Sequence, residues 1–152
     1  MTLDIEIPTT KDIDSIHELL NYYSKKEVIL ERTKEDIEDS INNFLIARYD
    51  NKIIGAISYY EYDNNLKEIR SLAVLNKFKK LGVGTKLIKA LIDKIQVKEQ
   101  LRIFALTYSP DFFITNGFTE IDKNLLPEKI WKDCDKCKNK KNCGEIALLY
   151  NN

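Results

Sequence analysis

Lys79-Lys80-Leu81-Gly82-Val83-Gly84-Thr85 is the stretch that decides the fold, because it stands between a strand pattern and an amphipathic helix pattern. Backbone N–H groups at a helix start, together with the positive end of the helix dipole, bind phosphate groups. Gly82 and Gly84 let phosphates approach the backbone closely, and Lys79 and Lys80 add positive charge. The stretch matches neither a Walker loop nor the Rossmann pattern. It predicts a pyrophosphate site of another kind, with an ordinary strand-to-helix turn as the alternative.

The chain before this stretch predicts one strand, two helices and a three-strand meander. An alternating apolar pattern predicts the first strand, and apolar residues at helical spacing, behind a cap at Thr10 or Asp12, predict the first helix. Thr33, followed by acidic residues, predicts the cap of a second, short helix. The other elements are expected at Leu3–Ile7, at a helix with the stripe Ile13, Ile16, Leu20 and Tyr23, and at the strands Phe44–Tyr49, Ile53–Tyr62 and Leu66–Val74.

The chain after the stretch predicts two more helices and three strands. The elements are a helix with the stripe Val83, Leu87, Ile88, Leu91, Ile92 and Ile95, the strand Leu101–Thr107, the helix Pro110–Asn116 ended by a left-handed Gly117, and the strands Phe118–Ile121 and Glu145–Tyr150. This order predicts an α/β (α+β) fold: a mixed, mostly antiparallel twisted sheet of about six to seven strands, flanked by helices on both faces. One domain is expected over residues 1–152, with a cysteine-containing insertion near 126–144 before the last strand.

Composition and charge exclude several classes of protein. The 24 basic and 24 acidic residues cancel, so no net field draws the chain to nucleic acid or to a membrane surface. The first residues lack the pattern of a signal peptide, and no apolar run approaches the ~20 residues that a transmembrane helix needs. The three cysteines, Cys134, Cys137 and Cys143, are an odd number confined to one segment, which favours reduced thiols. We therefore expect a cytoplasmic protein that binds neither nucleic acid nor membrane.

The glycine-containing stretch resembles the signature Q/R-x-x-G-x-G/A of the GNAT superfamily of acetyltransferases, with Lys79 where Arg or Gln is usual. Phe112-Phe113-Ile114-Thr115-Asn116-Gly117-Phe118 is similar to the superfamily's F-Y-x-K-x-G-F segment, and the order of elements also matches. The resemblance implies a GNAT fold, acetyl-CoA as cosubstrate, and transfer of its acetyl group to an amine.

A narrower resemblance is to short, stand-alone N-acetylglutamate synthases, which are amino-acid N-acetyltransferases of arginine biosynthesis. Besides the segment 112–118 it rests on Glu68–Val74, Leu106–Tyr108, Leu126–Trp131, the cysteine tail, and Ile29–Thr33 with Glu31 in place of a proline. It implies a transferase that acetylates the α-amino group of L-glutamate by direct attack in a ternary complex. The alternatives are a GNAT enzyme that acetylates a protein N-terminus, a lysine or a polyamine, and a non-catalytic CoA-binding module.

The resemblance also assigns the acetyl-CoA contacts. The pyrophosphate is expected on Lys79, Lys80, Leu81, Gly82, Val83, Gly84 and Thr85, the pantetheine arm on the backbone of Leu72, Ala73 and Val74, and Phe113 beside that arm. A backbone N–H near Val74 is expected to polarise the thioester carbonyl.

Glu68 is the candidate general base, and a solvent-facing Glu at a strand start is the alternative. Tyr108 is the candidate general acid, because Phe113 stands where the superfamily has a tyrosine; water is an equal alternative. Arg32 and Arg70 are the candidates that bind the acceptor carboxylates, against surface salt bridges, and Arg70 shares a strand face with Glu68.

The cysteine tail has the spacing of a zinc ligand pair at Cys134 and Cys137 but lacks a clear fourth ligand, so we assign no metal site. A zinc-ribbon protein that binds nucleic acid is disfavoured by the zero net charge and the single Cys-x-x-Cys pair. The expected partner is a small-molecule acceptor amine, and the sequence is compatible with a homodimer.

Overall fold

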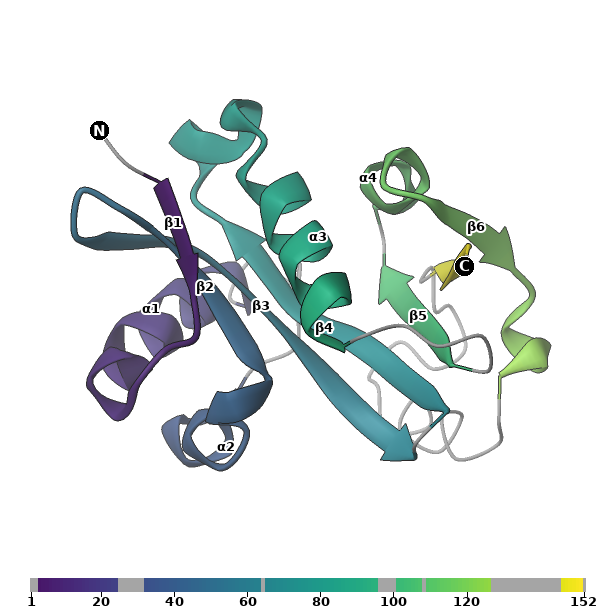
Figure 1. Cartoon of the computed structure of the whole chain (residues 1–152), viewed down its shortest axis with the longest axis horizontal. Helices are drawn as coiled ribbons and strands as arrows, with labels where there is room; N and C mark the ends of the chain where they lie inside the picture. Colours follow the sequence, from purple (N-terminus) through teal and green to yellow (C-terminus); the bar gives the residue numbers. More distant parts are fainter. Residues whose placement is uncertain are drawn as a thin grey trace. The chain divides into compact units, whose positions relative to one another are not determined.

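The computed structural model describes residues 3–24, 32–63, 65–95, 101–107, 109–126 and 146–151. The chain divides into two compact units, Met1–Leu101 and Arg102–Asn152, and each is described by itself. Seven strands and four α-helices lie in the described ranges (Figure 1).

The first unit contains an antiparallel sheet of four strands in the order β1-β2-β3-β4. Its strands are β1 (Leu3–Glu6), β2 (Phe44–Tyr49), β3 (Lys52–Asp63) and β4 (Leu66–Val74). Its helices are α1 (Ile13–Ser24), α2 (Lys34–Asp39) and α3 (Val83–Ile95), and 3₁₀ turns lie at Thr10–Asp12, Ile41–Asn43 and Asn76–Leu81.

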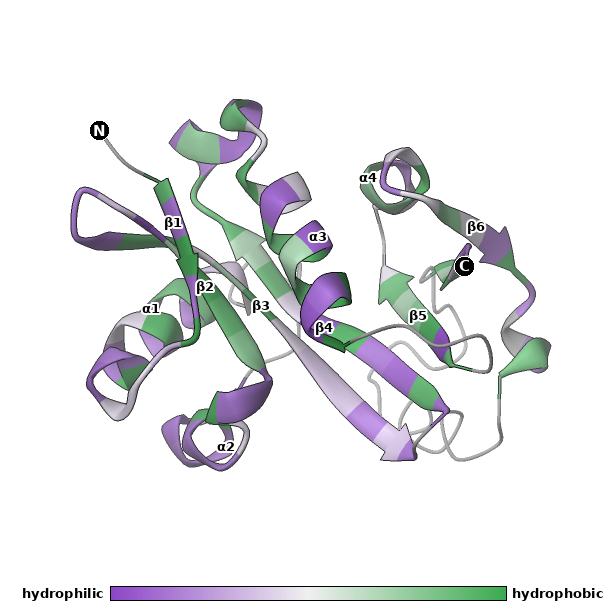
Figure 2. Ribbon diagram, in the orientation of Figure 1, coloured by the Kyte–Doolittle hydropathy of each residue, from purple (hydrophilic) through white to green (hydrophobic). Residues whose placement is uncertain are grey.

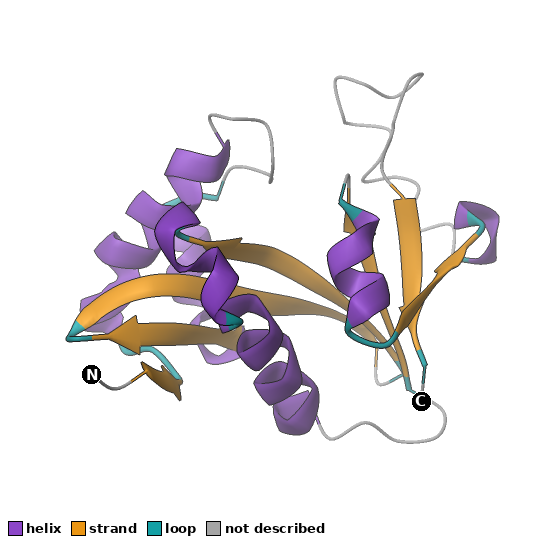
Figure 3. Cartoon of the chain, turned by 90° about the horizontal axis from the view of Figure 1, so that it is seen from above, coloured by secondary structure: helices purple, strands orange, loops and turns teal. Residues whose placement is uncertain are grey.

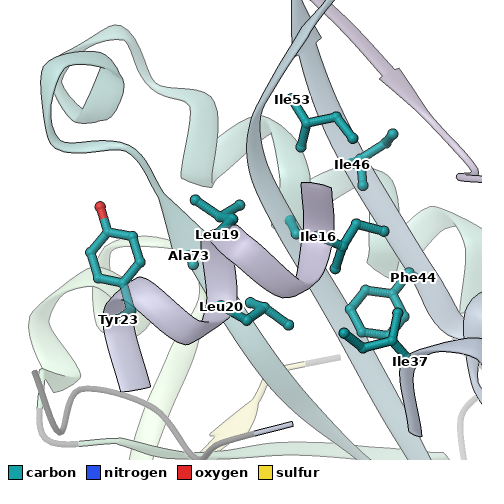
Figure 4. Packing of buried hydrophobic residues seen from close by; sticks show 10 residues of the cluster. Ile16, Leu19, Leu20, Tyr23, Ile37, Phe44, Ile46, Ile53 and Ala73 are labelled. Carbon is teal, nitrogen blue, oxygen red and sulfur yellow. The ribbon is translucent and has the colours of Figure 1, made fainter. Parts of the chain in front are cut away.

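The two faces of this sheet carry different helices. On one face, α1 and α2 form a buried cluster with β2, β3 and β4 that contains Ile16, Leu19, Leu20, Tyr23, Ile37, Phe44, Ile46, Ile53, Ala56 and Ala73 (Figure 4). Gly55, next to Ala56, faces the other way, since neighbouring strand residues alternate. A Cβ at Gly55 would meet Leu87 of α3 at 3.1 Å. The helices therefore cover both faces of this unit's sheet, as expected (Figure 3).

Local signals explain where these elements begin and end. Asp50 and Asn51 have φ of +49° and +65°, the conformation of a tight two-residue hairpin turn. Thr33 caps α2, because its hydroxyl accepts from the Asp36 N–H at 3.1 Å. A 3₁₀ turn at Thr10–Asp12 precedes α1, and Thr9 caps this turn, with its N–H donating to Asp12 Oδ2 at 2.9 Å. The cap of the first helix at Thr10 or Asp12 stays a prediction.

The second unit is a smaller antiparallel sheet in the order β5-β7-β6. Its strands are β5 (Arg102–Thr107), β6 (Phe118–Ile121) and β7 (Ile146–Tyr150), with α4 (Pro110–Thr115) and a 3₁₀ turn at Lys123–Leu125. Gly117 has φ of +93° after the end of α4, which confirms its predicted left-handed conformation.

The predicted fold class is confirmed for the described residues, which carry seven strands in mostly antiparallel pairing together with helices. In Figure 2, most of the visible length of β2 has the green of hydrophobic residues, while outward-facing turns of α3 have the purple of hydrophilic ones. No helix in the described part of the chain is long and apolar enough to cross a bilayer. The single domain over 1–152 stays a prediction. Of the predicted cysteine-containing insertion near 126–144, the described residues include Leu126 alone.

Candidate active site

The predicted phosphate stretch is a 3₁₀ turn followed by the start of α3. Gly82 separates the two with φ of +74°, a conformation that favours glycine. The first helical bond runs from the Lys86 N–H to the Gly82 carbonyl at 3.1 Å. The N–H groups of Val83, Gly84 and Thr85 precede it and have no acceptor within the helix. A Cβ at Gly82 would meet nothing within 4 Å, so the backbone here is open to a ligand.

Two buried side chains hold this stretch in place. Phe78 packs on Tyr49 with 5.4 Å between ring centres, and Val83 is fully buried at the start of α3. Lys79, Lys80 and Leu81 lie between them and are exposed. The alternation of anchored and exposed residues therefore presents positive charge beside the open helix start, where it adds to the attraction that the backbone N–H groups exert on a phosphate.

β4 contains a bulge directly before its last residues. Ala56 pairs with Ala73 and Ser58 with Arg70, so Ser71 and Leu72 together face the single residue Ile57. Ser71 has φ of +56°, which costs a non-glycine residue about 1–2 kcal/mol. The candidates Leu72, Ala73 and Val74 follow this bulge, and bulges re-aim the strand beyond them.

Arg32, which precedes α2, stabilises the bulge through hydrogen bonds. Its Nη1 donates to the hydroxyls of Ser58 and Ser71, both at 3.0 Å. Its Nη2 donates to Ser40 at 2.9 Å, and its Nε to Asp36 Oδ2 at 2.7 Å. These contacts engage four of the five N–H donors of a guanidinium. Arg32 is therefore tied to β3, β4 and α2, and its direct contact with an acceptor carboxylate stays a prediction.

Glu68 and Arg70 lie on one face of β4, as the period of two predicted, and are joined directly. The Glu68 side chain is buried, with 8% of the residue exposed, so the alternative of a solvent-facing Glu68 is wrong. Its Oε1 accepts from Arg70 Nε at 2.9 Å and from the Tyr62 hydroxyl at 2.8 Å. Arg70 Nη2 donates to the Tyr62 hydroxyl at 2.9 Å, and the Tyr60 ring centre is 4.4 Å from the guanidinium carbon.

The electrostatics of this cluster keep two of its members in one protonation state. Burial raises the pKa of Tyr62, and the Glu68 carboxylate raises it further, so the phenol stays protonated. Burial lowers the pKa of Arg70, but the neighbouring Glu68 and Tyr62 outweigh burial and raise it overall. The cluster therefore offers a fixed cation, a neutral phenol and a carboxylate that can accept a proton.

The second unit holds the remaining candidate that the structure describes. Phe113 is buried with 7% exposure and packs edge-on against Phe118, with 5.3 Å between ring centres. Phe118 in turn packs on Tyr150 at 5.2 Å. Tyr108 lies outside the described residues, as do the three cysteines. Among the described residues no group of three or more His, Cys, Asp and Glu side chains is placed to hold a metal ion.

Several residues of the site were missed by sequence reasoning. Tyr62 could have been found, since it alternates with Tyr60 on the strand opposite Glu68 and Arg70. Ser58 and Ser71 carry no such signal, because a buried hydroxyl and a left-handed serine look like ordinary strand residues in the sequence.

Comparison with known proteins identifies the family. A family model described as an acetyltransferase (GNAT) domain matches residues 13–131. An uncharacterised N-acetyltransferase of Chlorobaculum tepidum is 34% identical over 91% of this chain and 89% of its own length. An amino-acid acetyltransferase of Mycobacterium tuberculosis is 28% identical over 82% of this chain and 72% of its own.

Solved structures agree with the family match. An N-acetylglutamate synthase of Neisseria gonorrhoeae, complexed with coenzyme A and N-acetyl-glutamate, superposes with a TM-score of 0.85 at 25% identity, covering 99% of this chain and 35% of that chain. A Mycobacterium tuberculosis protein in complex with CoA superposes with a TM-score of 0.82 at 24% identity and shows the same fold. The chain therefore belongs to the GNAT acetyltransferase family and is an acetyl-CoA-dependent N-acetyltransferase.

Proposed function

We propose that this chain transfers the acetyl group of acetyl-CoA to the α-amino group of a free amino acid, with L-glutamate as the acceptor. The amine attacks the thioester directly while both substrates are bound. A cytoplasmic location and a step in arginine biosynthesis belong to the same proposal. The similarity to amino-acid acetyltransferases and to an N-acetylglutamate synthase supports it.

The observation that carries the proposal is the cluster of Glu68, Arg70 and Tyr62. An amino acid arrives with a protonated amine and at least one carboxylate, so its acetylation needs a proton acceptor and a cation close together. Glu68 and Arg70 supply these groups from one strand face, with 2.9 Å between them. About a third of the Arg70 side chain is exposed, and a planar guanidinium suits the binding of a carboxylate.

Acetyl-CoA is proposed to bind along the end of β4 and over Gly82. Its pyrophosphate is placed against the N–H groups of Val83, Gly84 and Thr85, with Lys79 and Lys80 beside it. Its pantetheine arm is placed on the backbone of Leu72, Ala73 and Val74, in the way that an added strand pairs with its neighbour. Holding both substrates in one complex removes much of the entropic barrier, ~7 kcal/mol or more.

A thiol-release assay over a panel of acceptors tests the proposal. The panel contains the common amino acids, a polyamine and a short peptide with a free N-terminus. L-glutamate should give the highest kcat/KM, and Arg70→Gln should raise the glutamate KM by roughly 10- to 150-fold while the acetyl-CoA KM changes little. Arg102→Gln is the control, since Arg102 is exposed at the start of β5.

The panel also separates the alternatives. A higher kcat/KM for the polyamine or the peptide would replace glutamate with that class of acceptor. Thermal stabilisation by acetyl-CoA without thiol release for any acceptor would indicate a CoA-binding module instead of an enzyme acting on these amines.

A further inference from the structure

Tyr60 of β3 lies beside the cluster of Glu68, Arg70 and Tyr62 and takes no part in the proposed chemistry. It pairs directly with Glu68 across the two strands, so both side chains lie on one face of the sheet. Arg70 lies diagonally opposite Tyr60 on the same face, at a separation that aromatic and long side chains can span. Tyr60 is 47% exposed, so its ring is accessible to a molecule that binds on this face.

The Tyr60 ring packs against the guanidinium of Arg70. The guanidinium carbon lies over this ring at 4.4 Å from its centre, whereas it is 5.9 Å from the centre of the Tyr62 ring. The contact is attractive, because the face of an aromatic ring is electrically negative and the guanidinium is a cation. Tyr62 also contacts the Tyr60 ring in an edge arrangement, with 4.8 Å between the ring centres and 67° between the planes. The ring that holds Arg70 is therefore itself held.

The hydrogen bonds of Arg70 and its contact with the ring restrain different movements. Its Nε donates to Glu68, and its Nη2 donates to the Tyr62 hydroxyl. These two nitrogens lie along one edge of the planar guanidinium, and bonds along one edge do not by themselves prevent the plane from rocking about that edge. A ring packed against the group opposes this rocking, because the guanidinium would have to clash with the ring or move away from it.

We propose that Tyr60 is a positioning residue for the acceptor, whose ring holds the Arg70 guanidinium in the orientation in which it binds the acceptor carboxylate. A carboxylate binds a guanidinium through parallel hydrogen bonds in the guanidinium plane, so the affinity depends on the direction of that plane. A plane that is already fixed also loses less conformational freedom when the carboxylate binds. The inference rests on the proposed role of Arg70 and holds for any acceptor that carries a carboxylate.

Tyr60→Leu tests the inference, because it removes the ring and keeps an apolar side chain. The acceptor KM should rise by about three- to tenfold. The kcat and the acetyl-CoA KM should stay within about twofold of the wild type, because the substitution leaves Glu68 and the acetyl-CoA contacts in place. Tyr60→Phe keeps the ring and should keep the acceptor KM of the wild type. An equal rise in Tyr60→Phe would assign the effect to the hydroxyl and would overturn the role of the ring.

A double-mutant cycle with Arg70→Gln shows whether Tyr60 acts through Arg70. In the Arg70→Gln background, Tyr60→Leu should not raise the acceptor KM further, because no guanidinium is left for the ring to hold. An undiminished effect in that background would show that Tyr60 contacts the acceptor itself, and would overturn the positioning role. Tyr59→Leu is the matched control. Tyr59 lies on the opposite face of β3 with its ring centre 5.5 Å from Lys67 Nζ, and its loss should leave the acceptor KM unchanged.

NMR of the arginine side chains, without any acceptor, measures the holding of Arg70 directly. The arginines of the chain are Arg32, Arg48, Arg70 and Arg102, and Arg70→Gln identifies the Arg70 signal by its loss. Rotation about the Nε–Cζ bond of Arg70 turns the Nη groups out of the plane, so it should be about three- to tenfold faster in Tyr60→Leu. The rotation of Arg48 should not change. An unchanged rotation rate of Arg70 would overturn the inference, whichever amine the enzyme acetylates.

Failure of the positioning role is distinguishable from failure of the proposed function. An unchanged acceptor KM in Arg70→Gln would contradict the proposed role of Arg70 and, with it, the role of Tyr60 at the acceptor. A wild-type acceptor KM in Tyr60→Leu, beside a raised one in Arg70→Gln, would overturn the role of Tyr60 alone and leave the proposed function standing.

Discussion

At the scale of single residues, Glu68 shows how one carboxylate is prepared for proton transfer. Both described donors, Arg70 Nε and the Tyr62 hydroxyl, bond to the same oxygen, Oε1. They fix the position of the carboxylate. The second oxygen is the one through which a proton could be taken, directly or through a water, from an amine bound beside Arg70.

Glu68→Gln should lower kcat by roughly 10²–10⁴-fold with an amino-acid acceptor. Gln keeps the volume and an accepting oxygen, but it cannot take the proton of the amine. The residual rate should climb with pH, because the fraction of neutral amine rises. The raised pKa of Tyr62 keeps that phenol protonated between pH 7 and pH 9.5. The increase of the rate with pH therefore reflects deprotonation of the acceptor amine. The measurement is kcat between pH 7 and pH 9.5, with acetyl-CoA affinity expected near that of the wild type.

Tyr62→Phe is the control for Glu68→Gln. It removes one donor to Oε1 but leaves the carboxylate and its partner Arg70, so most of kcat should survive. A Glu68→Gln variant with wild-type kcat at pH 7 would remove Glu68 from the mechanism. The base would then be a water chain or the acceptor's own carboxylate.

Arg32 carries the second residue-scale prediction. Lys keeps the charge but cannot reach Asp36 and three serine hydroxyls at once. Arg32→Lys should therefore reduce the free energy of unfolding by ~1.5–3 kcal/mol in urea titrations. Ser71→Gly should restore about 1 kcal/mol in that background, because glycine adopts the left-handed φ without strain.

Kinetic measurements then distinguish a role of Arg32 in stabilising the bulge from direct binding of the acceptor. If Arg32 also binds the acceptor, Arg32→Ala should raise the acceptor KM far more than the acetyl-CoA KM. Equal changes in the two values would show that Arg32 serves the fold of the site alone.

At the scale of elements, periodic patterns predicted the helices and strands closely, because each buries one face. The strand predicted at Leu66–Val74 and the stripe from Val83 to Ile95 match β4 and α3. The features missed have no period. The sequence predicts no element over Asn76–Leu81, where the structure has a 3₁₀ turn, and the bulge at Ser71 leaves the alternation around it nearly intact.

At Gly82, the effect of backbone strain can be separated from the effect of a side chain that obstructs the pyrophosphate. Gly82→Asn and Gly82→Val both add a Cβ on the open side of the loop. Asn tolerates the left-handed conformation, whereas a β-branched residue is strongly strained in it. Gly82→Val should therefore be the less stable of the two variants without ligand, and both should lose most of the thermal shift that acetyl-CoA gives the wild type.

Thermal melts with and without acetyl-CoA measure both effects. A full wild-type shift in either folded variant would contradict the placement of the pyrophosphate over Gly82. Retention of the shift in Gly82→Asn alone would assign the loss in Gly82→Val to strain.

At the scale of the whole molecule, the sequence predicted residue types at the site better than their contacts. The contacts of Arg32 with Ser58 and Ser71 span 26 and 39 positions of the chain, and the contact of Tyr23 with Val74 spans 51. Such pairs exist only once the sheet and its helices have packed. No local pattern encodes them.

A network at the N-terminal end of the chain links stability to pH. Arg48 of β2 donates to Glu6 of β1 at 2.6 Å and to Asp12 before α1 at 2.9 Å. Burial raises the pKa of Asp12, but the hydrogen bond from the Thr9 backbone and the contact with Arg48 outweigh burial, so the pKa lies below its ordinary value overall. The folded protein therefore holds this carboxylate in its charged form more strongly than the unfolded chain does.

The sign of the resulting pH dependence follows from that depressed pKa. The stability contributed by Asp12 is fully present above the unfolded pKa, about 3.9, and is lost as pH falls through the lower folded pKa. Arg48→Met should therefore be less stable than the wild type at pH 7, and the difference should shrink as pH falls below about 4. Urea midpoints at pH 7, 5, 4 and 3 measure it. Lys34→Met is the control, because its pair with Asp14 is exposed and surface pairs contribute little. A difference between Arg48→Met and the wild type that stays constant from pH 7 to pH 3 would show that Arg48 acts through packing of its side chain and not through the charge of Asp12.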